Sequence, residues 1–151
     1  YGGGVFVSGY VYLSQCLFEA NTADAAGGFA NGGALADLDT LTNSRITVNQ
    51  TVINANSADF GGGFYIQGAD VLVANSLFFQ NTAANDGGAL SVFNSTSLVI
   101  VIYSTIAFNH DLGGVENGSG MYLGNGSLLV TSSLVVNNDG GDLFYSAGTL
   151  S

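Results

Sequence analysis

The sequence predicts an all-β fold, a right-handed, single-stranded parallel β-helix (a solenoid) of about five coils of 25–35 residues, in a single domain over residues 1–151. Three observations predict it. An eleven-residue apolar motif occurs five times without gaps, and glycine pairs lie between successive copies. The chain also has no proline, which would remove a hydrogen bond from a continuous sheet.

The motif alternates in polarity and ends at an asparagine in every copy. The five copies end at Asn21, Asn56, Asn81, Asn109 and Asn138, at intervals of 35, 25, 28 and 29 residues. Because alternate residues of a strand point to the same side, we expect the third and eighth places to face inward on two successive strands. The third place holds Leu13, Val48, Val73, Val101 and Val130, and the eighth holds Phe18, Ile53, Phe78, Ile106 and Val135. These residues are the predicted core rows.

The terminal asparagines have two interpretations. In the first, their side-chain amides form a ladder, each bonded to its copy one coil away, as in cross-β stacks. In the second, each asparagine closes its own turn through a local Asx hydrogen bond. Retention of asparagine in all five copies, while its neighbours change, favours the ladder.

The glycine pairs indicate a corner between copies. Gly27-Gly28, Gly61-Gly62-Gly63 and Gly87-Gly88 each lead into another apolar strand. Such pairs are typical of a turn that needs positive φ, or of backbone so close to the next coil that a Cβ would collide. We therefore expect a glycine corner at each of these pairs.

The composition restricts the class of protein. Apolar residues make up 47% of the chain and charged residues 8%, which excludes disorder through high charge. The formal charge of −10 leaves no basic surface for nucleic acid or an anionic membrane. The longest apolar run, residues 98–108, is too short to span a bilayer as a helix, so no membrane span is expected. Cys16 is the single cysteine, which excludes an intrachain disulfide.

The whole pattern resembles right-handed parallel β-helix repeat proteins, including polymorphic outer-membrane proteins and autotransporter-type passengers, whose repeats carry GGA[I/L] and FxxN. The matching elements are Gly32-Gly33-Ala34-Leu35, Gly87-Gly88-Ala89-Leu90, Phe18 to Asn21 and Phe78 to Asn81. Isoleucine or valine replaces the phenylalanine in the other three copies. The resemblance implies the fold but not one function, because this scaffold carries adhesins, pectin-degrading enzymes and phage tailspikes.

The resemblance also implies that lyases on this scaffold use a basic residue with bound calcium and that hydrolases use clustered aspartates. Arg45 is the only permanent cation, and His110, the sole histidine, is expected at an outward turn. Asp37 and Asp39 share one face of a possible strand, where they either serve glycoside hydrolysis or form a polar loop rim. These residues do not form a recognisable catalytic set, so we expect no catalytic residues and no enzyme.

Acidic residues follow the terminal asparagines by one to five positions and are expected along one edge. They are Asp24, Asp59, Asp86, Asp111 and Asp139. Carboxylates from successive coils either share calcium, which prefers oxygen ligands, or keep the edge soluble and discourage wrong strand pairing. Calcium is the only cofactor that the sequence suggests.

Four sequons mark possible glycosylation sites in a eukaryotic host. They begin at Asn49, Asn94, Asn117 and Asn125. The last three are expected in loops, and Asn49 is expected within the core motif, pointing outward.

The second, seventh and ninth places of the motif should point outward, yet they are mostly apolar from the third copy onward. The residues are Leu72, Leu77, Phe79, Ile100, Leu129, Leu134 and Val136. One apolar strip of this length exceeds what a monomer tolerates and predicts an interface. Both ends of the helix are expected to be open, so head-to-tail stacking into a fibre, or continuation into a longer passenger, is also predicted.

The sequence therefore predicts a non-catalytic structural scaffold in an extracellular or cell-surface location. It would be a fibre subunit or an adhesin stalk that self-associates laterally or head to tail. The alternative is a polysaccharide-degrading, pectinase-like enzyme or its carbohydrate-binding remnant.

Overall fold

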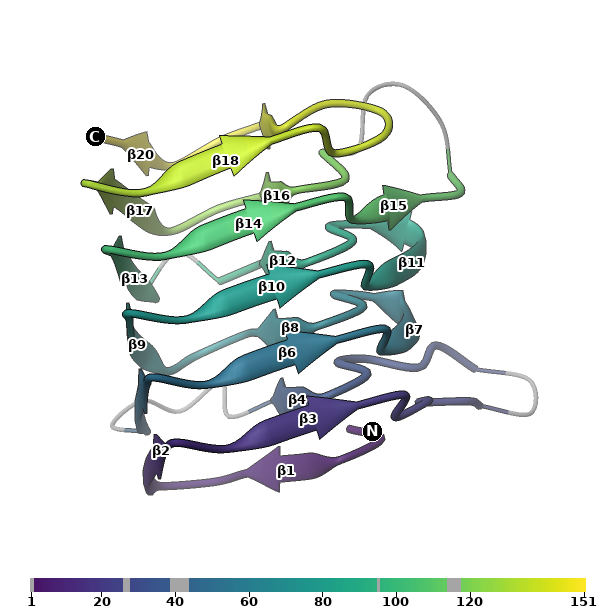
Figure 1. The fold of residues 1–151 in the computed structure, drawn as a ribbon, viewed down its shortest axis with the longest axis horizontal. Helices are drawn as coiled ribbons and strands as arrows, with labels where there is room; N and C mark the ends of the chain where they lie inside the picture. Colours follow the sequence, from purple (N-terminus) through teal and green to yellow (C-terminus); the bar gives the residue numbers. More distant parts are fainter. Residues whose placement is uncertain (1, 26–27, 39–43, 95, 114–117) are drawn as a thin grey trace.

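The computed structural model describes residues 2–25, 28–38, 44–94, 96–113 and 118–151. Over these residues the chain is all-β, without a helix, and its strands pair in parallel. Figure 1 shows the foreground strands running to the right and the fainter strands behind them returning to the left, each turn above the last. The chain is therefore a right-handed parallel β-solenoid.

Four parallel sheets form the sides of the solenoid, here named faces A to D. Face A contains β1 (Val5–Val7), β4 (Leu35–Asp37), β8 (Phe64–Ile66), β12 (Leu90–Val92), β16 (Met121–Leu123) and β19 (Leu143–Tyr145). Face B contains β2 (Tyr10–Ser14), β5 (Arg45–Asn49), β9 (Asp70–Ala74), β13 (Leu98–Ile102), β17 (Ser127–Thr131) and β20 (Thr149–Leu150). Face C contains β3 (Leu17–Glu19), β6 (Val52–Asn54), β10 (Leu77–Phe79), β14 (Thr105–Ala107) and β18 (Leu134–Val136). Face D contains β7 (Ser57–Phe60), β11 (Thr82–Asp86) and β15 (His110–Asp111).

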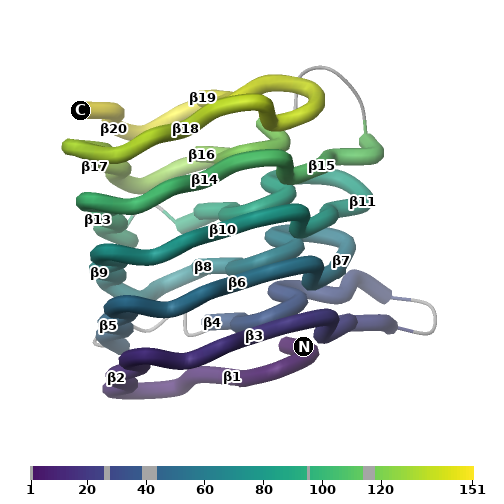
Figure 2. The backbone as a smooth tube through the Cα atoms, in the orientation of Figure 1, coloured from purple at the N-terminus to yellow at the C-terminus, as the bar shows by residue number. Residues whose placement is uncertain are grey.

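The solenoid has about four turns, slightly fewer than the five coils expected from the motif count. The difference arises on face D, which has three strands where faces A and B have six each. In the first and last coils that side is reduced to isolated bridges, Thr22 with Ser57 and His110 with Asp139. Figure 2 shows these coils stacked one above another along a single axis.

The strand register aligns the core rows vertically. On face C the eighth places pair in succession from Phe18 to Val135, and on face B the third places pair from Leu13 to Val130. The central members, such as Ile53 and Val73, are fully buried. Because burial of each such side chain contributes roughly 1.5–3 kcal/mol, these rows supply much of the stabilising free energy.

Two bends in every motif copy are made by non-glycine residues with left-handed backbone. At the fifth place φ is 49° to 55° in Gln15, Gln50, Asn75, Tyr103 and Ser132. At the tenth place φ is 54° to 57° in Ala20, Ala55, Gln80, Phe108 and Asn137. Alanine and phenylalanine seldom adopt this conformation, so the stacking of coils imposes it rather than local preference.

Glycine makes the third corner, where two of the three predicted pairs are found. Gly61 and Gly87 have φ of 60° and 68°, and a Cβ at Gly62 would collide with the carbonyl oxygen of Thr82 in the next coil. The pair Gly27-Gly28 is the exception, because the corner of that coil lies at Gly32-Gly33. Gly27 lies outside the described residues, and a Cβ at Gly28 would meet no atom within 4 Å.

Candidate functional site

The asparagines that end the motif copies are hydrogen-bonded to one another. Asn21 donates from Nδ2 and from its backbone N to Oδ1 of Asn56, at 2.8 and 3.0 Å. The same arrangement joins Asn56 to Asn81, Asn81 to Asn109 and Asn109 to Asn138, with Nδ2 to Oδ1 distances of 2.9 Å. These contacts between coils are those of the ladder interpretation. They satisfy buried amides that would each cost about 1–3 kcal/mol if left unpaired.

A second ladder follows the sixth place of the motif, where sequence reasoning recognised only small residues. Each hydroxyl accepts the backbone N–H of the corresponding residue one coil earlier, as in Thr51 to Ser76 and Ser76 to Ser104, both at 3.1 Å. Each hydroxyl also donates to a carbonyl two residues before it, for example Ser76 to Ala74 at 2.7 Å. Cys16 occupies the same place in the first coil and is a half-buried free thiol. Side-chain bonds therefore join the coils along two edges.

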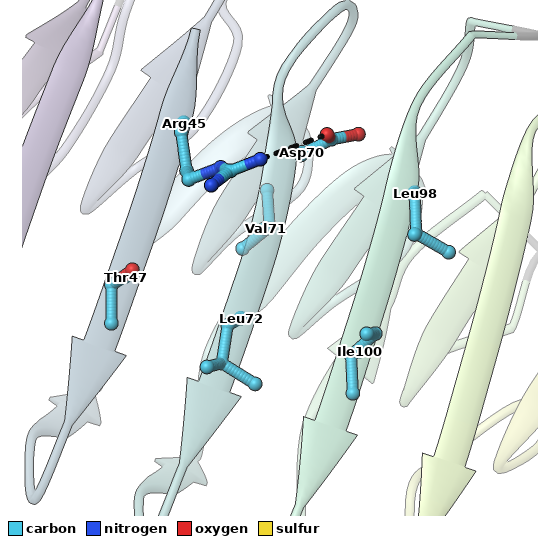
Figure 3. Close-up of a pocket in the computed structure, with 7 residues that line it drawn as sticks. All are labelled: Arg45, Thr47, Asp70, Val71, Leu72, Leu98 and Ile100. Atoms are coloured by element: carbon cyan, nitrogen blue, oxygen red, sulfur yellow. Dashed lines mark ion pairs between the residues drawn. The ribbon is translucent and has the colours of Figure 1, made fainter.

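Two of the catalytic candidates each contact an aspartate at an exposed position, on different sides of the solenoid. Arg45 on face B places Nη2 3.9 Å from Oδ2 of Asp70, with both side chains at least half exposed (Figure 3). His110 on face D has Nδ1 3.4 Å from Oδ2 of Asp139. The two pairs therefore lie on separate sides of the solenoid.

Asp37, at the end of β4, has its carboxylate bound by backbone N–H groups. The side chain is fully buried, and its Oδ2 accepts the backbone N–H groups of Gly68 and Ala69, both at 2.8 Å. Asp37 therefore holds the loop of the next coil. Asp39, the other member of the proposed carboxylate pair, lies outside the described residues.

The acidic residues considered for calcium are not equivalent. Asp24 is exposed, Asp59 accepts the N–H of Ala30 at 2.8 Å, and Asp139 contacts a histidine. Asp86 and Asp111, on the neighbouring strands β11 and β15, lie close enough for their charges to interact. No group of three or more His, Cys, Asp or Glu that could hold a metal occurs among the described residues.

The carboxylates of Asp86 and Asp111 lie at the corner between faces D and A. Burial, with a smaller contribution from the charge of Asp86, raises the pKa of Asp111 to about 6, although the N–H groups of Gly113 and Gly87 favour the ionised form. Burial also raises the pKa of Asp86. The fold therefore disfavours the ionised form of both carboxylates.

Aromatic rings stack along the outside of face A beside this corner. Tyr65 stacks on Phe93 with ring centroids 5.4 Å apart, Phe93 contacts Tyr122 at 5.2 Å, and Tyr122 stacks on Phe144 at 5.6 Å and 7°. Burial, and then the charge of Asp86, raises the pKa of Tyr122. This stack could have been recognised in the sequence, because several of the strands that follow a glycine corner have an aromatic residue at their middle position.

The single apolar strip expected from the sequence is divided between two faces, which corrects that prediction. Leu72, Ile100 and Leu129 pair in register on face B, whereas Leu77, Phe79, Leu134 and Val136 lie on face C. The left-handed bend at the fifth place turns the chain between them. These two sets, called the apolar rows below, include Leu72 at 39% exposure and Leu134 at 55%.

A shallow hollow of about 270 Å³ lies on face B over one apolar row. Figure 3 shows Leu72 and Ile100 beside Leu98, with the pair of Arg45 and Asp70 at one end. The hollow is mostly apolar, so it favours an apolar occupant rather than an anionic sugar.

The sequons have mixed environments. Asn49 is half-buried at the end of β5, and its Oδ1 accepts the side-chain amide of Asn75 at 2.9 Å. Asn94 follows β12, and Asn125 lies in the turn before β17. Asn117 lies outside the described residues.

The fold alone does not select a function, because parallel β-solenoids serve both as structural proteins and as enzymes. Within the described ranges, no helix has the length and apolar character needed to cross a membrane. No protein-family model, curated protein or solved structure matches the chain.

Proposed function

We propose that this protein is a non-catalytic structural scaffold of the extracellular space or cell surface, either a fibre subunit or an adhesin stalk. The observation that carries the proposal is the unbroken asparagine ladder from Asn21 to Asn138. Side-chain bonds parallel to the axis, added to the backbone bonds of four sheets, resist bending and shear between coils. Rigidity is the property that a stalk or fibre needs.

The positions of the candidate catalytic groups support a non-catalytic role. Arg45 and His110 lie in exposed pairs on separate faces, and the Asp37 carboxylate is occupied by backbone N–H groups. General acid–base catalysis needs two such groups within reach of one substrate bond. The described candidates do not meet that requirement. Release of reducing ends or unsaturated sugars from a pectin-like polysaccharide would contradict this proposal and favour the enzyme alternative.

The apolar rows support lateral association with a second copy of the chain. They extend over successive coils in register, so an extended partner of the same repeat would match them along the axis. Two copies that each carry a formal charge of −10 repel at low ionic strength. Association is therefore expected to strengthen as salt screens the charges.

The resemblance to polymorphic outer-membrane proteins and autotransporter-type passengers supports the cell-surface location. In that arrangement the solenoid displays a surface away from the cell, with or without glycan on its sequons. Labelling of intact cells with an antibody against the chain tests this location, and a signal only after the cells are broken would contradict it.

Light scattering on a sizing column and negative-stain images test the assembly. We expect oligomers or filaments that grow with salt, and Leu72→Asp, which adds a charge to the face B apolar row, should reduce them. Thr22→Asp is the matched control, because it adds the same charge at an exposed position on the face D side. Single short rods at every salt concentration, or equal effects of the two variants, would contradict the proposal.

A further inference from the structure

Asp111 interrupts a row of alanines on face D. In the strand register it follows Ala58 and Ala83, both buried, so a carboxylate stands where the preceding coils bury a methyl group. Its Oδ1 accepts the N–H of Gly113 at 2.7 Å. Its Oδ2 is buried and has no hydrogen-bond partner among the described residues. One oxygen of this carboxylate therefore lacks a donor.

A buried hydroxyl shares the same corner. Ser91 on β12 takes the register position that Tyr65 and Tyr122 hold in the neighbouring coils. The side chain is fully buried, and its Oγ also lacks a hydrogen-bond partner within the described part of the chain. Ser91 lies against Gly87, where an added Cβ would be 3.0 Å from the serine Cβ, and the N–H of Gly87 acts on the Asp111 carboxylate. Gly87 therefore lies between the Ser91 side chain, which packs against it, and the Asp111 carboxylate, on which its N–H acts.

No lysine or arginine side chain lies at this corner to balance its negative charge. Asp86 adds a second negative charge close enough to act on Asp111. Arg45 is the only Lys or Arg of the chain, and it pairs with Asp70 on face B. The adjacent His110 directs its ring at a different carboxylate. Two partly buried carboxylates without a counter-ion are costly, and a bound cation removes that cost.

We propose that Asp86, Asp111 and Ser91 form a Ca²⁺ site that joins two successive coils at the corner between faces D and A. The donors are all oxygen atoms, which suits a hard cation better than Zn²⁺, whose protein sites are dominated by Cys and His ligands. Calcium accepts irregular geometry and completes its shell with backbone carbonyls and water, whereas Mg²⁺ demands an octahedron. The site is additional to the scaffold function and does not depend on it.

Terbium luminescence tests the site directly, because Tb³⁺ occupies calcium sites and is excited by nearby tyrosine. The chain has no tryptophan and seven tyrosines, so emission reports on tyrosine alone. We expect saturable binding of Tb³⁺ that CaCl₂ reverses and MgCl₂ reverses poorly. Tyr122→Phe should lower the emission without changing the affinity, because this ring lies near Asp86. Emission that does not saturate, or that Mg²⁺ displaces as well as Ca²⁺, would overturn the proposal.

Asp111→Ala is the decisive variant, because it restores the residue of the two preceding coils and should fold. We expect it to weaken Tb³⁺ binding by about tenfold or more, and Ser91→Ala to weaken it less. Asp24→Asn, which removes one exposed negative charge, should change the affinity by less than about twofold. Equal losses in Asp111→Ala and Asp24→Asn would mean general attraction to an acidic chain and would overturn the proposal. A rise in melting temperature with CaCl₂ that Asp111→Ala abolishes gives a second, independent readout.

Discussion

Asp142 Oδ1 accepts both the side-chain amide and the backbone N–H of Asn138, at 2.8 and 3.1 Å. Each Nδ2 of the asparagine ladder donates to Oδ1 of the next asparagine, and the last Nδ2, in Asn138, donates to this carboxylate instead of another amide. Because a carboxylate accepts and cannot donate, the series of donors ends at Asp142.

Replacing Asp142 tests its role in stabilising the last described coils. Asp142→Ala leaves the backbone N–H of Asn138 without this acceptor and leaves Nδ2 with only the carbonyl oxygen of Ile106. We expect a loss of about 1 kcal/mol or slightly more in the free energy of unfolding. Asp142→Asn keeps an acceptor oxygen and should lose less. Urea unfolding followed by circular dichroism measures both variants, and equal losses would show that the carbonyl-like acceptor is unimportant.

The centre of the ladder should be more sensitive than its first member. Asn81 is fully buried and bonded on both sides, so Asn81→Ala removes an acceptor from Asn56 and a donor from Asn109. We expect a loss of roughly 2–4 kcal/mol in unfolding free energy. Asn21→Ala, at a half-buried position bonded on one side, should cost clearly less. The same urea titration compares them, and similar costs would argue against a continuous ladder.

The glycine corners give a pair of substitutions with opposite expectations. Gly62→Ala places a Cβ against the carbonyl oxygens of Thr82 and Gly88, and we expect a loss of roughly 3 kcal/mol or failure to fold. Gly28→Ala meets no atom within 4 Å and should change stability by less than about 0.5 kcal/mol. Thermal unfolding of the two purified variants measures both changes in stability. A tolerant Gly62 would mean that the coils are packed less closely at this corner.

The raised pKa of Asp111 predicts a particular pH dependence of the metal-free protein. The carboxyl titrates near its ordinary value of 3.8 when unfolded and at about 6 when folded, so the folded state binds more protons between these values. The contribution of Asp111 to stability should therefore fall as pH rises from about 4 to about 6 and then level off. The measurement is the melting temperature in EDTA, taken as the difference between the native chain and Asp111→Ala. A flat difference would show that Asp111 ionises normally in the fold.

The repeated motif determined the fold and the core because every coil has an apolar residue at the same inward-facing places. Phe18, Ile53 and Phe78 differ in side chain but share one place in an eleven-residue frame. A pattern repeated in register at each coil predicts which side chains must meet, whatever the length of the loops between copies. The asparagine ladder could be expected for the same reason.

The remaining features depend on contacts between coils, which no single motif copy contains. The bends at Ala20 and Phe108 adopt left-handed backbone because stacked neighbours hold them there, against the preference of those residues. One such bend, at the fifth place, separates the two apolar rows that looked continuous along the chain. The position of Gly87 beside both Asp111 and Ser91 depends on which coil stacks on which and in what register. The local sequence determined the structure of each coil, and only the packing between coils decided which surface groups became neighbours.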